Sequence, residues 1–467
     1  MATTLHIVSL GCARNDVDSE ELAARFDQAG FALVDQSEQA DVVVVNTCGF
    51  IESAKTESID EILAAADHRA DGSAPTVVAV GCLAERYGSD LAQSLPEADA
   101  VIGFDGYDDI AATVRAVMAG TRVTPPAPTD RRRLLPISPV ARASTASGPP
   151  APWMPSQRTR LVGSPSAPLK IASGCDRRCA FCAIPSFRGA FQSRGLDAIR
   201  AEATWLASQG GRELFLVSEN TTSYGKDLAD PHALESLLTG LSDVDGIDWI
   251  RLSYLQPAEL RPSLIEAIAA TDKVVPYFDL PFQHASGSVL RRMRRFGDAD
   301  SFLGLLDQIR ALMPNAGIRS NFIVGFPGET EDDLTQLKQF LGAADFDAVG
   351  IFGYSDEEGT SGATLDGHLS EETIAWRARE ISELADTLVS LRAFDRIGES
   401  VSVMIESVDE QVSGRAEQQG PEDGRCQVVG LSHDEPPRVG HILSATITGG
   451  DGVDWVVDSS SGDRTGE

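Results

Sequence analysis

The chain has 467 residues, 42% of them hydrophobic, and a formal net charge of −31 at pH 7. That length predicts roughly two to four domains, and the negative charge argues against a general nucleic-acid binder, which would need a basic face. No apolar run is long enough for a membrane helix, and the N-terminus lacks the basic and apolar regions of a secretory signal. We therefore expect a cytoplasmic protein without membrane partners, in which seven cysteines indicate metal or redox chemistry rather than disulfides.

Residues 1–122 alternate short apolar runs with helical patterns, which predicts an open parallel α/β sheet. The expected strands are residues 5–10, 42–46, 77–80 and 100–102, with helices over 18–28 and 51–66. A cysteine follows each of the first three strands: Cys12, Cys48 and Cys82. Because the carboxyl ends of parallel strands share one edge of a sheet, these thiols can converge. Placement alone leaves open whether they hold a metal cluster or are unrelated buried thiols.

The composition changes over residues 123–166, which are rich in Pro, Ser, Ala and Arg. Such a segment cannot bury enough apolar surface to offset the entropy of ordering, so we expect a mostly flexible linker with Trp153 as a possible anchor. The three arginines at residues 131–133 could contact RNA, but we favour the interpretation that they belong to a solvated linker.

Residues 167–395 contain six expected strands with helices between them. The strands are residues 169–172, 214–218, 249–253, 276–280, 318–324 and 348–352. Six β/α units are too few for a closed eight-stranded barrel, so they predict an open, partial (β/α)6 barrel whose site lies at the C-terminal mouth.

The loop after the first of these strands carries Cys175, Cys179 and Cys182 in the spacing C-x3-C-x2-C. A four-iron cluster usually takes four thiolates, so three leave one iron open to another ligand. A structural zinc site generally needs a fourth Cys or His nearby, and no His occurs between Gly72 and Pro231. The spacing therefore favours an iron–sulfur cluster over zinc or a set of buried thiols.

Residues 396–460 contain short strand patterns that predict a small β-barrel, and residues 461–467 are expected to be a disordered tail. The strands are expected at 401–405, 425–429, 440–447 and 454–457, and Cys426 within the second is expected to be an inert buried thiol. From Arg396 onward there are five Arg, no Lys and fourteen Asp or Glu, a net charge of −9. That sign is wrong for phosphates. It suits a basic protein partner, although plain solubility also explains it.

The order of a three-cysteine domain, a C-x3-C-x2-C core and a small barrel resembles the methylthiotransferase family of radical S-adenosylmethionine (SAM) enzymes over nearly the whole chain. The C-terminal barrel resembles a TRAM domain, which is OB-like. Some members of this family modify transfer RNA and others a ribosomal protein. Segments that resemble the second branch are residues 10–20, 45–51, 53–55, 283–286 and 354–359. Residues 218–220 lean toward the first branch, so a tRNA adenosine methylthiotransferase is the alternative, and a non-catalytic iron–sulfur scaffold is a more distant one.

The resemblance implies methylthiolation of the β-carbon of an aspartate in small-subunit ribosomal protein twelve, free or in the small subunit. It implies two [4Fe-4S] clusters, one held by Cys12, Cys48 and Cys82 and one held by Cys175, Cys179 and Cys182. The second donates an electron to SAM, and the resulting 5′-deoxyadenosyl radical removes an unactivated hydrogen that acid–base catalysis cannot reach. The first delivers sulfur, and a second SAM supplies the methyl group. A sulfur source and an electron donor such as flavodoxin or ferredoxin are therefore implied as partners.

Polar and glycine-containing segments at the expected mouth are candidates for contacts with SAM. They are Ser218, Glu219, Asn220, Gln283, Asn321, Ile323, Gly325, Pro327 and Arg188. Gly325 and Gly328 would let the backbone approach adenosine, and Pro327 would stiffen the turn. Each segment also fits an ordinary turn, and Arg188 fits either the SAM carboxylate or a protein carboxylate. We favour His284 as a hydrogen-bonded residue that shapes its loop over a proton carrier.

Overall fold

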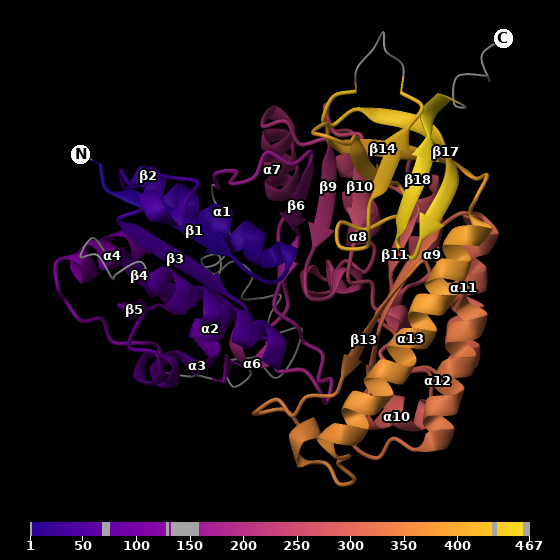
Figure 1. Cartoon of the computed structure of the whole chain (residues 1–467), viewed down its shortest axis with the longest axis horizontal. Helices are drawn as coiled ribbons and strands as arrows, with labels where there is room; N and C mark the ends of the chain where they lie inside the picture. Colours follow the sequence, from indigo (N-terminus) through magenta and orange to yellow (C-terminus); the bar gives the residue numbers. More distant parts are fainter. Residues whose placement is uncertain (1, 68–74, 128–129, 132–157, 432–436, 461–467) are drawn as a thin grey trace. The chain divides into compact units, whose positions relative to one another are not determined.

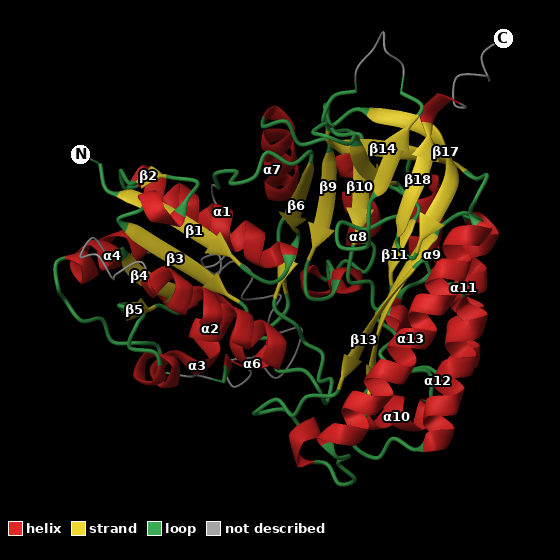
Figure 2. Cartoon of the chain, viewed as in Figure 1, coloured by secondary structure: helices red, strands yellow, loops and turns green. Residues whose placement is uncertain are grey.

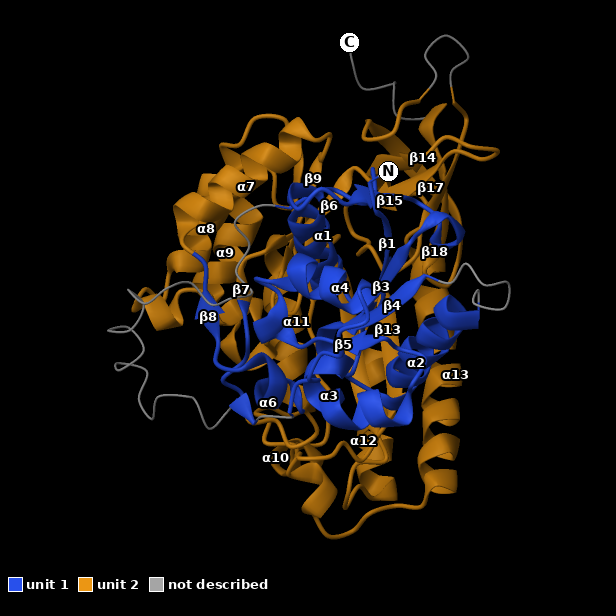
Figure 3. Ribbon diagram, turned by 90° about the vertical axis from the view of Figure 1, so that its left-hand side faces the viewer, with its two compact units in different colours: residues 1–163, 173–177, 183–194 blue, residues 164–172, 178–182, 195–467 orange. Residues whose placement is uncertain are grey.

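A computed structural model describes residues 2–67, 75–127, 130–131, 158–431 and 437–460 (Figure 1). The chain divides into two compact units, which Figure 3 colours separately. The first contains residues 1–163, 173–177 and 183–194, and the second contains residues 164–172, 178–182 and 195–467. The chain therefore passes back and forth between the two units in the segment that carries the C-x3-C-x2-C cysteines.

The first unit is built on a five-stranded parallel sheet in the order β2-β1-β3-β4-β5. Its strands are β1 (Thr4–Ser9), β2 (Ala32–Leu33), β3 (Val42–Thr47), β4 (Thr76–Val80) and β5 (Ala100–Val101). Every residue of the central strand β3 is buried, as expected for a parallel sheet covered on both faces. The predicted open parallel sheet is confirmed.

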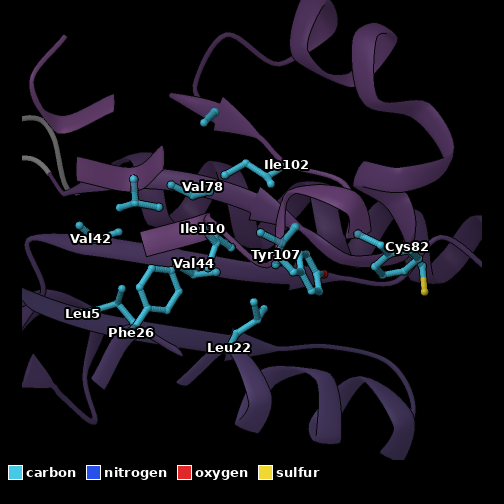
Figure 4. Packing of buried hydrophobic residues seen from close by; sticks show 14 of the residues in the cluster. Leu5, Leu22, Phe26, Val42, Val44, Val78, Cys82, Ile102, Tyr107 and Ile110 are labelled. Atoms are coloured by element: carbon cyan, nitrogen blue, oxygen red, sulfur yellow. The ribbon is translucent and has the colours of Figure 1, made fainter. Parts of the chain in front are cut away.

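Helices cover both faces of this sheet (Figure 2). They are α1 (Ala13–Gln28), α2 (Glu52–Asp67), α3 (Gly81–Ser94), α4 (Ile110–Met118) and α6 (Ile184–Arg188), with 3₁₀ turns η1 (Ser37–Gln39) and η3 (Phe104–Gly106). Because side chains alternate along a strand, Val42 and Val44 pack with Phe26 of α1 (Figure 4), while Val43 and Val45 face α2 and α3.

The segment expected to be a flexible linker is anchored at both of its described ends. Arg131 is buried and pairs with Glu85 at 2.8 Å and with Asp105 at 2.9 Å. Arg158 and Arg160 each lie 3.3 Å from Glu20 of α1. The expectation of a solvated segment is therefore wrong for these arginines, because the buried carboxylates of Glu85 and Glu20 give them partners. The rest of the basic run and Trp153 lie outside the described residues.

The core of the second unit has six parallel strands in two sheets of three, β10-β9-β6 and β11-β12-β13. The strands are β6 (Ser166–Lys170), β9 (Glu213–Val217), β10 (Trp249–Leu252), β11 (Tyr277–Asp279), β12 (Gly317–Val324) and β13 (Ala348–Gly353). A bridge between Ile250 and Val274 continues from the first sheet toward the second. The predicted partial barrel is confirmed. The short strands β7 (Ala172–Ser173) and β8 (Gln192–Ser193) flank the cysteine segment along the chain.

The helices of this core lie outside the strands (Figure 2). They are α7 (Leu196–Ser208), α8 (Ala233–Ser242), α9 (Pro262–Ala270), α10 (Gly287–Arg292), α11 (Ala299–Leu312), α12 (Glu331–Ala344) and α13 (Glu371–Asp395). The 3₁₀ turns are η5 (Thr221–Ser223), η6 (Lys226–Leu228), η7 (Pro257–Glu259) and η8 (Gly362–Thr364). Thr330 caps α12 by accepting a hydrogen bond from the N–H of Asp333, the helix start expected from the sequence. Within the described residues, no helix is both long and apolar enough to span a membrane.

The second unit ends in a closed barrel of strands in the order β14-β15-β16-β18-β17. They are β14 (Ser400–Ser407), β15 (Ser413–Ala416), β16 (Cys426–Val429), β17 (Ile442–Asp451) and β18 (Asp454–Asp458). The predicted small barrel is confirmed, with one more strand than expected. Strand β15 escapes prediction because it is only four residues long and contains Gly414 and the buried Arg415.

A buried ion-pair group joins the barrel to the core within this unit. Arg251 Nε of β10 lies 2.6 Å from Glu213 Oε1 of β9, and Arg415 of β15 pairs with the same carboxylate. All three side chains are at most 1% exposed. Arg251 also donates to the carbonyl oxygen of Glu417 at 2.7 Å. Charged groups buried this completely need partners, so the barrel and the core satisfy each other's charges.

Candidate functional site

The three strand-end cysteines of the first unit stand on adjacent turns. Cys12 is the N-cap of α1, Cys48 follows β3, and Cys82 lies in the first turn of α3. Gly11 has a φ of +91°, and a Cβ there would lie 2.8 Å from Cys48 Cβ and 3.0 Å from Cys48 Sγ. Only glycine accommodates both that backbone conformation and so close an approach. The sheet edge therefore brings the first two cysteine turns into contact.

Asn15 of α1 ties these turns together. Its Nδ2 donates to the carbonyl oxygens of Leu10 at 2.8 Å and Thr47 at 3.1 Å, and its Oδ1 is 3.7 Å from Cys82 Sγ. Arg14 Nη2 lies 3.6 Å from Cys12 Sγ. Sequence reasoning missed Asn15, because the groups that it joins are far apart along the chain.

The thiols lie close enough for their charges to interact. Burial raises the pKa of Cys48, and a charged Cys12 raises it further. Burial raises the pKa of Cys82 to about 11, an effect that Arg188 opposes and that Cys12 and Cys48 reinforce. The buried thiols of Cys48 and Cys82 therefore need added positive charge to become thiolates, and a metal centre supplies it. This donor set therefore fits the iron–sulfur cluster expected here.

In the part of the chain that the structure describes, no group of three or more His, Cys, Asp or Glu side chains is arranged to hold a metal ion. A four-iron cluster distributes its thiolates, one to each iron, whereas a single ion gathers all its ligands around itself.

The C-x3-C-x2-C segment is held by backbone hydrogen bonds in each unit. In the first unit, Cys175 N–H donates to Gly189 O at 3.1 Å. In the second unit, Ala180 N–H donates to Met293 O at 3.0 Å, and its carbonyl oxygen accepts from Gly362 N–H at 2.7 Å. Cys182 N–H donates to Cys179 O at 3.2 Å, and Arg295 Nη1 lies 3.8 Å from Cys179 Sγ. The portion with Cys179 and Cys182 is thus held at Ala180, between the C-terminal end of α10 and the start of η8.

Ser218, Glu219 and Asn220 follow β9, as the sequence predicts. Ser218 is fully buried, and its Oγ accepts from Asn220 N–H at 3.2 Å. Asn220 Nδ2 donates to Glu259 Oε2 at 3.1 Å, and Glu219 is half-buried. Glu259, absent from the predicted site, therefore organises this turn.

The chain that follows β11 runs beside β12, and this brings together Gln283, Asn321 and Ile323. Gln283 N–H donates to Asn321 O at 2.9 Å, and Ile323 N–H donates to Gln283 O at 2.8 Å. Gln283 has a φ of +73°, a strained conformation for a residue with a side chain. A parallel bridge between Gln283 and Phe322 therefore holds these candidates side by side on two neighbouring segments of the chain.

The glycines of residues 321–329 accommodate protein neighbours. A Cβ on Gly325 would lie 2.7 Å from Ile374, and one on Gly328 would lie 2.7 Å from Arg292. Pro327 O accepts from Arg292 Nε at 2.8 Å. Packing against α10 and α13 therefore requires small residues at both positions, and the expected approach of this backbone to adenosine stays a prediction.

His284 is fully buried, and its Nδ1 accepts from Ser286 N–H at 2.9 Å. The ring proton of the neutral tautomer is therefore on Nε2, which lies 3.4 Å from Glu329 Oε2. Arg377 of α13 donates to Glu329 at 2.7 Å. This arrangement supports the interpretation of His284 as a residue that shapes its loop.

Arg188 belongs to the first unit, among the strand-end cysteines. Its Nη2 donates to Cys82 Sγ at 3.1 Å and pairs with Asp18 at 2.8 Å. Arg188 thus has the protein carboxylate partner that was one of its two expected alternatives, and its contact with the SAM carboxylate stays a prediction.

Two family profiles match the chain. The radical SAM superfamily matches residues 169–341, and uncharacterized protein family UPF0004 matches residues 4–103. Among solved structures, the chain is similar to the radical S-adenosylmethionine methyltransferase TsrM from Kitasatospora setae, with a TM-score of 0.51, 15% identity and 75% of each chain covered. At that identity, the similarity concerns the fold alone.

Curated relatives are similar over nearly the whole chain. The protein named "Ribosomal protein uS12 methylthiotransferase RimO" from Cutibacterium acnes is 57% identical over 97% of both chains. Proteins of the same name are 57% identical in Saccharopolyspora erythraea, with 97% of this chain and 94% of that one covered, and 53% identical in Streptomyces coelicolor, with 97% and 96% covered. The chain therefore belongs to the RimO family of ribosomal protein uS12 methylthiotransferases, which are radical SAM enzymes of the transferase class.

Proposed function

We propose that the protein adds a methylthio group to the β-carbon of an aspartate in ribosomal protein uS12, free or within the small subunit. The observation that carries this proposal is the 57% identity, over 97% of both chains, to a relative named for uS12 methylthiolation. Modification of a tRNA adenosine is not favoured, because the three relatives compared all carry the ribosomal-protein name.

Cys12, Cys48 and Cys82 are proposed to hold one [4Fe-4S] cluster, and Cys175, Cys179 and Cys182 a second. The contact between the turns of Cys12 and Cys48, and the pinning of the second segment at Ala180, support these assignments. When bound, the clusters and two molecules of SAM per turnover supply an electron, a carbon radical, sulfur and a methyl group.

The protein's own residues are proposed to bind and orient these groups. Ser218, Glu219, Asn220, Gln283, Asn321, Ile323, Gly325 and Pro327 remain the proposed contacts for SAM. The hydrogen bonds that hold Gln283 between Asn321 and Ile323 support a preformed edge at this position. Glu329 accepts from Gly325 N–H at 2.9 Å, and so fixes the adjacent turn.

The division of the chain is proposed to follow the predicted domains. These are a methylthiotransferase domain over 1–122, a connecting segment over 123–166, a radical SAM core over 167–395, a TRAM barrel over 396–460 and a tail over 461–467. We further propose a cytoplasmic location, an electron donor such as flavodoxin or ferredoxin, and a separate sulfur source.

The proposed function is tested by mass spectrometry of uS12 from cells with and without the gene. We expect uS12 to lose the mass of one methylthio group in the deletion strain and to regain it when the gene is restored. Fragmentation should place that mass on an aspartate. Unchanged uS12, together with tRNA that lacks methylthioadenosine, would instead favour the tRNA alternative.

A further inference from the structure

Arg188 makes a direct contact with one of the proposed cluster ligands. It is the last residue of α6, its side chain is 4% exposed, and its Nη2 lies 3.1 Å from Cys82 Sγ. By comparison, Arg14 Nη2 lies 3.6 Å from Cys12 Sγ on a half-buried side chain. The contact from Arg188 is therefore shorter than that of Arg14 with Cys12 Sγ and that of Cys82 Sγ with Asn15 Oδ1 at 3.7 Å.

Several groups keep this guanidinium in place. Asp18 of α1 pairs with Nη2 at 2.8 Å, Asn15 Oδ1 accepts from it at 3.1 Å, and the guanidinium carbon lies 4.6 Å from the centre of the Phe104 ring. Phe187, the preceding residue, is buried in the core of the first unit. An arginine bound on this many sides keeps a fixed orientation toward Cys82, because reorienting it would break a buried ion pair.

We propose that Arg188 is a positioning residue for the first cluster: it hydrogen-bonds the Cys82 thiolate and raises the reduction potential of that cluster. The proposal rests on the proposed assignment of Cys12, Cys48 and Cys82 as ligands. Hydrogen bonds to the ligand sulfurs and nearby positive charge both favour the more negative, reduced form of an iron–sulfur cluster. Asp18 offsets part of the charge, but the hydrogen bond to sulfur remains.

Arg188 also lies close in sequence to the proposed ligands of the second cluster. Arg188 follows Cys182 by six residues, and Cys175 and residues 183–194 belong to the first unit together with Cys12, Cys48 and Cys82. The chain segment that follows the proposed ligands of the second cluster thus also supplies a buried hydrogen bond to a proposed ligand of the first. Packing of α6 against α3 fixes this relation within the first unit.

The test uses the full chain with Cys175, Cys179 and Cys182 changed to Ala, so that only the first cluster titrates. Arg188→Gln and Arg188→Lys are added separately, and each protein is reconstituted anaerobically. Dithionite supplies one electron to each oxidised cluster while electron paramagnetic resonance follows the reduced form. Arg25→Gln is the matched control, because Arg25 is in the same unit and pairs with Asp108 at 2.7 Å.

We expect a lower midpoint potential in Arg188→Gln, a smaller decrease in Arg188→Lys, which keeps the charge but not the forked donor, and no change in Arg25→Gln. An unchanged potential in Arg188→Gln with about four irons bound would overturn the proposal. If Arg188→Gln loses its iron, the midpoint potential of Arg188→Lys tests the proposal instead. A lowered potential in that variant supports the proposal, and an unchanged potential overturns it. A parent protein that binds no iron while Arg188 is intact would instead contradict the cluster assignment in the proposed function.

Discussion

At the scale of single residues, the two groups of cysteines can be separated by substitution. Replacing Cys175, Cys179 and Cys182 together by Ala should lower the iron content from about eight to about four per chain. The variant should no longer cleave SAM, because the electron for that cleavage is proposed to come from this cluster. Iron analysis and detection of 5′-deoxyadenosine after reduction measure the two effects.

Cys426→Ala is the matched control for that experiment. Cys426 is buried in the barrel, donates to Gln419 Oε1 at 3.1 Å and belongs to neither group. This variant should keep all its iron and its SAM cleavage. If the triple variant still cleaved SAM, the assignment of the C-x3-C-x2-C segment would be wrong.

Replacing Cys12, Cys48 and Cys82 together by Ala should have a different effect. Sulfur insertion into uS12 should stop, because the first cluster is proposed to deliver sulfur, whereas reductive cleavage of SAM should remain detectable. Product mass and 5′-deoxyadenosine are measured in the same reaction. Loss of 5′-deoxyadenosine while spectroscopy shows an intact second cluster would contradict this division of roles.

The cysteines can be picked out from the sequence, but several contacts around them and around His284 cannot. The spacing of Cys175, Cys179 and Cys182 and the strand-end positions of the other three are visible in the order of residues. Arg188 is 106 residues from Cys82, and Arg377 is 48 residues from Glu329. Such contacts depend on how elements pack, for which a single sequence carries no local pattern.

At the scale of elements, Glu213 of β9 connects the core to the barrel. Changing Glu213 to Gln would leave Arg251 and Arg415 buried without their carboxylate, which typically costs about 3–5 kcal/mol of stability. Denaturant unfolding of the full chain measures this loss. Glu266→Gln, on an exposed position of α9, is the matched control and should change stability little. Equal stability of the two variants would show that the buried group contributes nothing.

The same group predicts a pH dependence. Burial alone would raise the pKa of Glu213, but Arg415 and Arg251 outweigh it and hold the pKa well below its ordinary value. A depressed pKa in the folded state gives stability that is present above the unfolded value of about 4.3 and is lost as the pH falls below it. Glu213→Gln lacks this contribution, so its stability should fall less steeply between about pH 5 and pH 3. Parallel pH profiles for the variant and the wild type would contradict this.

The order and type of the main elements could be predicted because buried parallel strands form uninterrupted apolar runs. Their exact ends could not. Helix α1 begins at Ala13, several residues before the expected start, and α3 begins at Gly81, so that Cys82 is helical. Each helix starts beside a glycine with positive φ: Gly11 lies two residues before α1, and Gly81 is the first residue of α3. Both conformations depend on contacts with residues 46–48, at and just after the end of β3.

At the scale of the whole molecule, the exposed charge is more negative than the composition of the barrel suggests. Arg396 and Arg415 are buried in ion pairs, whereas Asp409, Glu410 and Asp451 are exposed. Ribosomal proteins are generally basic because they bind RNA, so attraction should speed encounter with uS12 and disfavour free tRNA. Added salt should slow association, since exposed charges are screened beyond about 10 Å at 0.1 M salt.

Neutralising the exposed acids tests this charge effect. The triple variant Asp409→Asn, Glu410→Gln, Asp451→Asn should bind uS12 more slowly than the wild type at low salt, with a smaller difference at moderate salt. Neutralising the exposed Arg425 and Arg438 instead should make association with uS12 faster than in the wild type at low salt. Stopped-flow association with uS12 and with tRNA, at two salt concentrations, measures both. Tight binding of tRNA without measurable affinity for uS12 would overturn the proposed substrate.

Removing residues 396–467 would be a poorer test of the barrel's role. Arg396 pairs with Asp347 of the core at 2.5 Å, and Arg319 of the core pairs with Asp423 of the barrel at 2.6 Å. A truncated chain would expose these core charges together with Glu213 and Arg251. Loss of uS12 binding could then follow from an unstable core, so surface substitutions separate binding from stability more cleanly.

The passage of the chain between the two units limits how parts of such proteins can be exchanged by recombination. A chimaera that joins residues 1–163 of one family member to the remainder of another would replace α3 and Asp18 but keep the original α6. Phe187 and Arg188 would then meet a foreign core and a foreign cysteine site. A functional exchange has to carry residues 173–177 and 183–194 along with the N-terminal part. The unit that can be exchanged is therefore encoded by separate stretches of the gene.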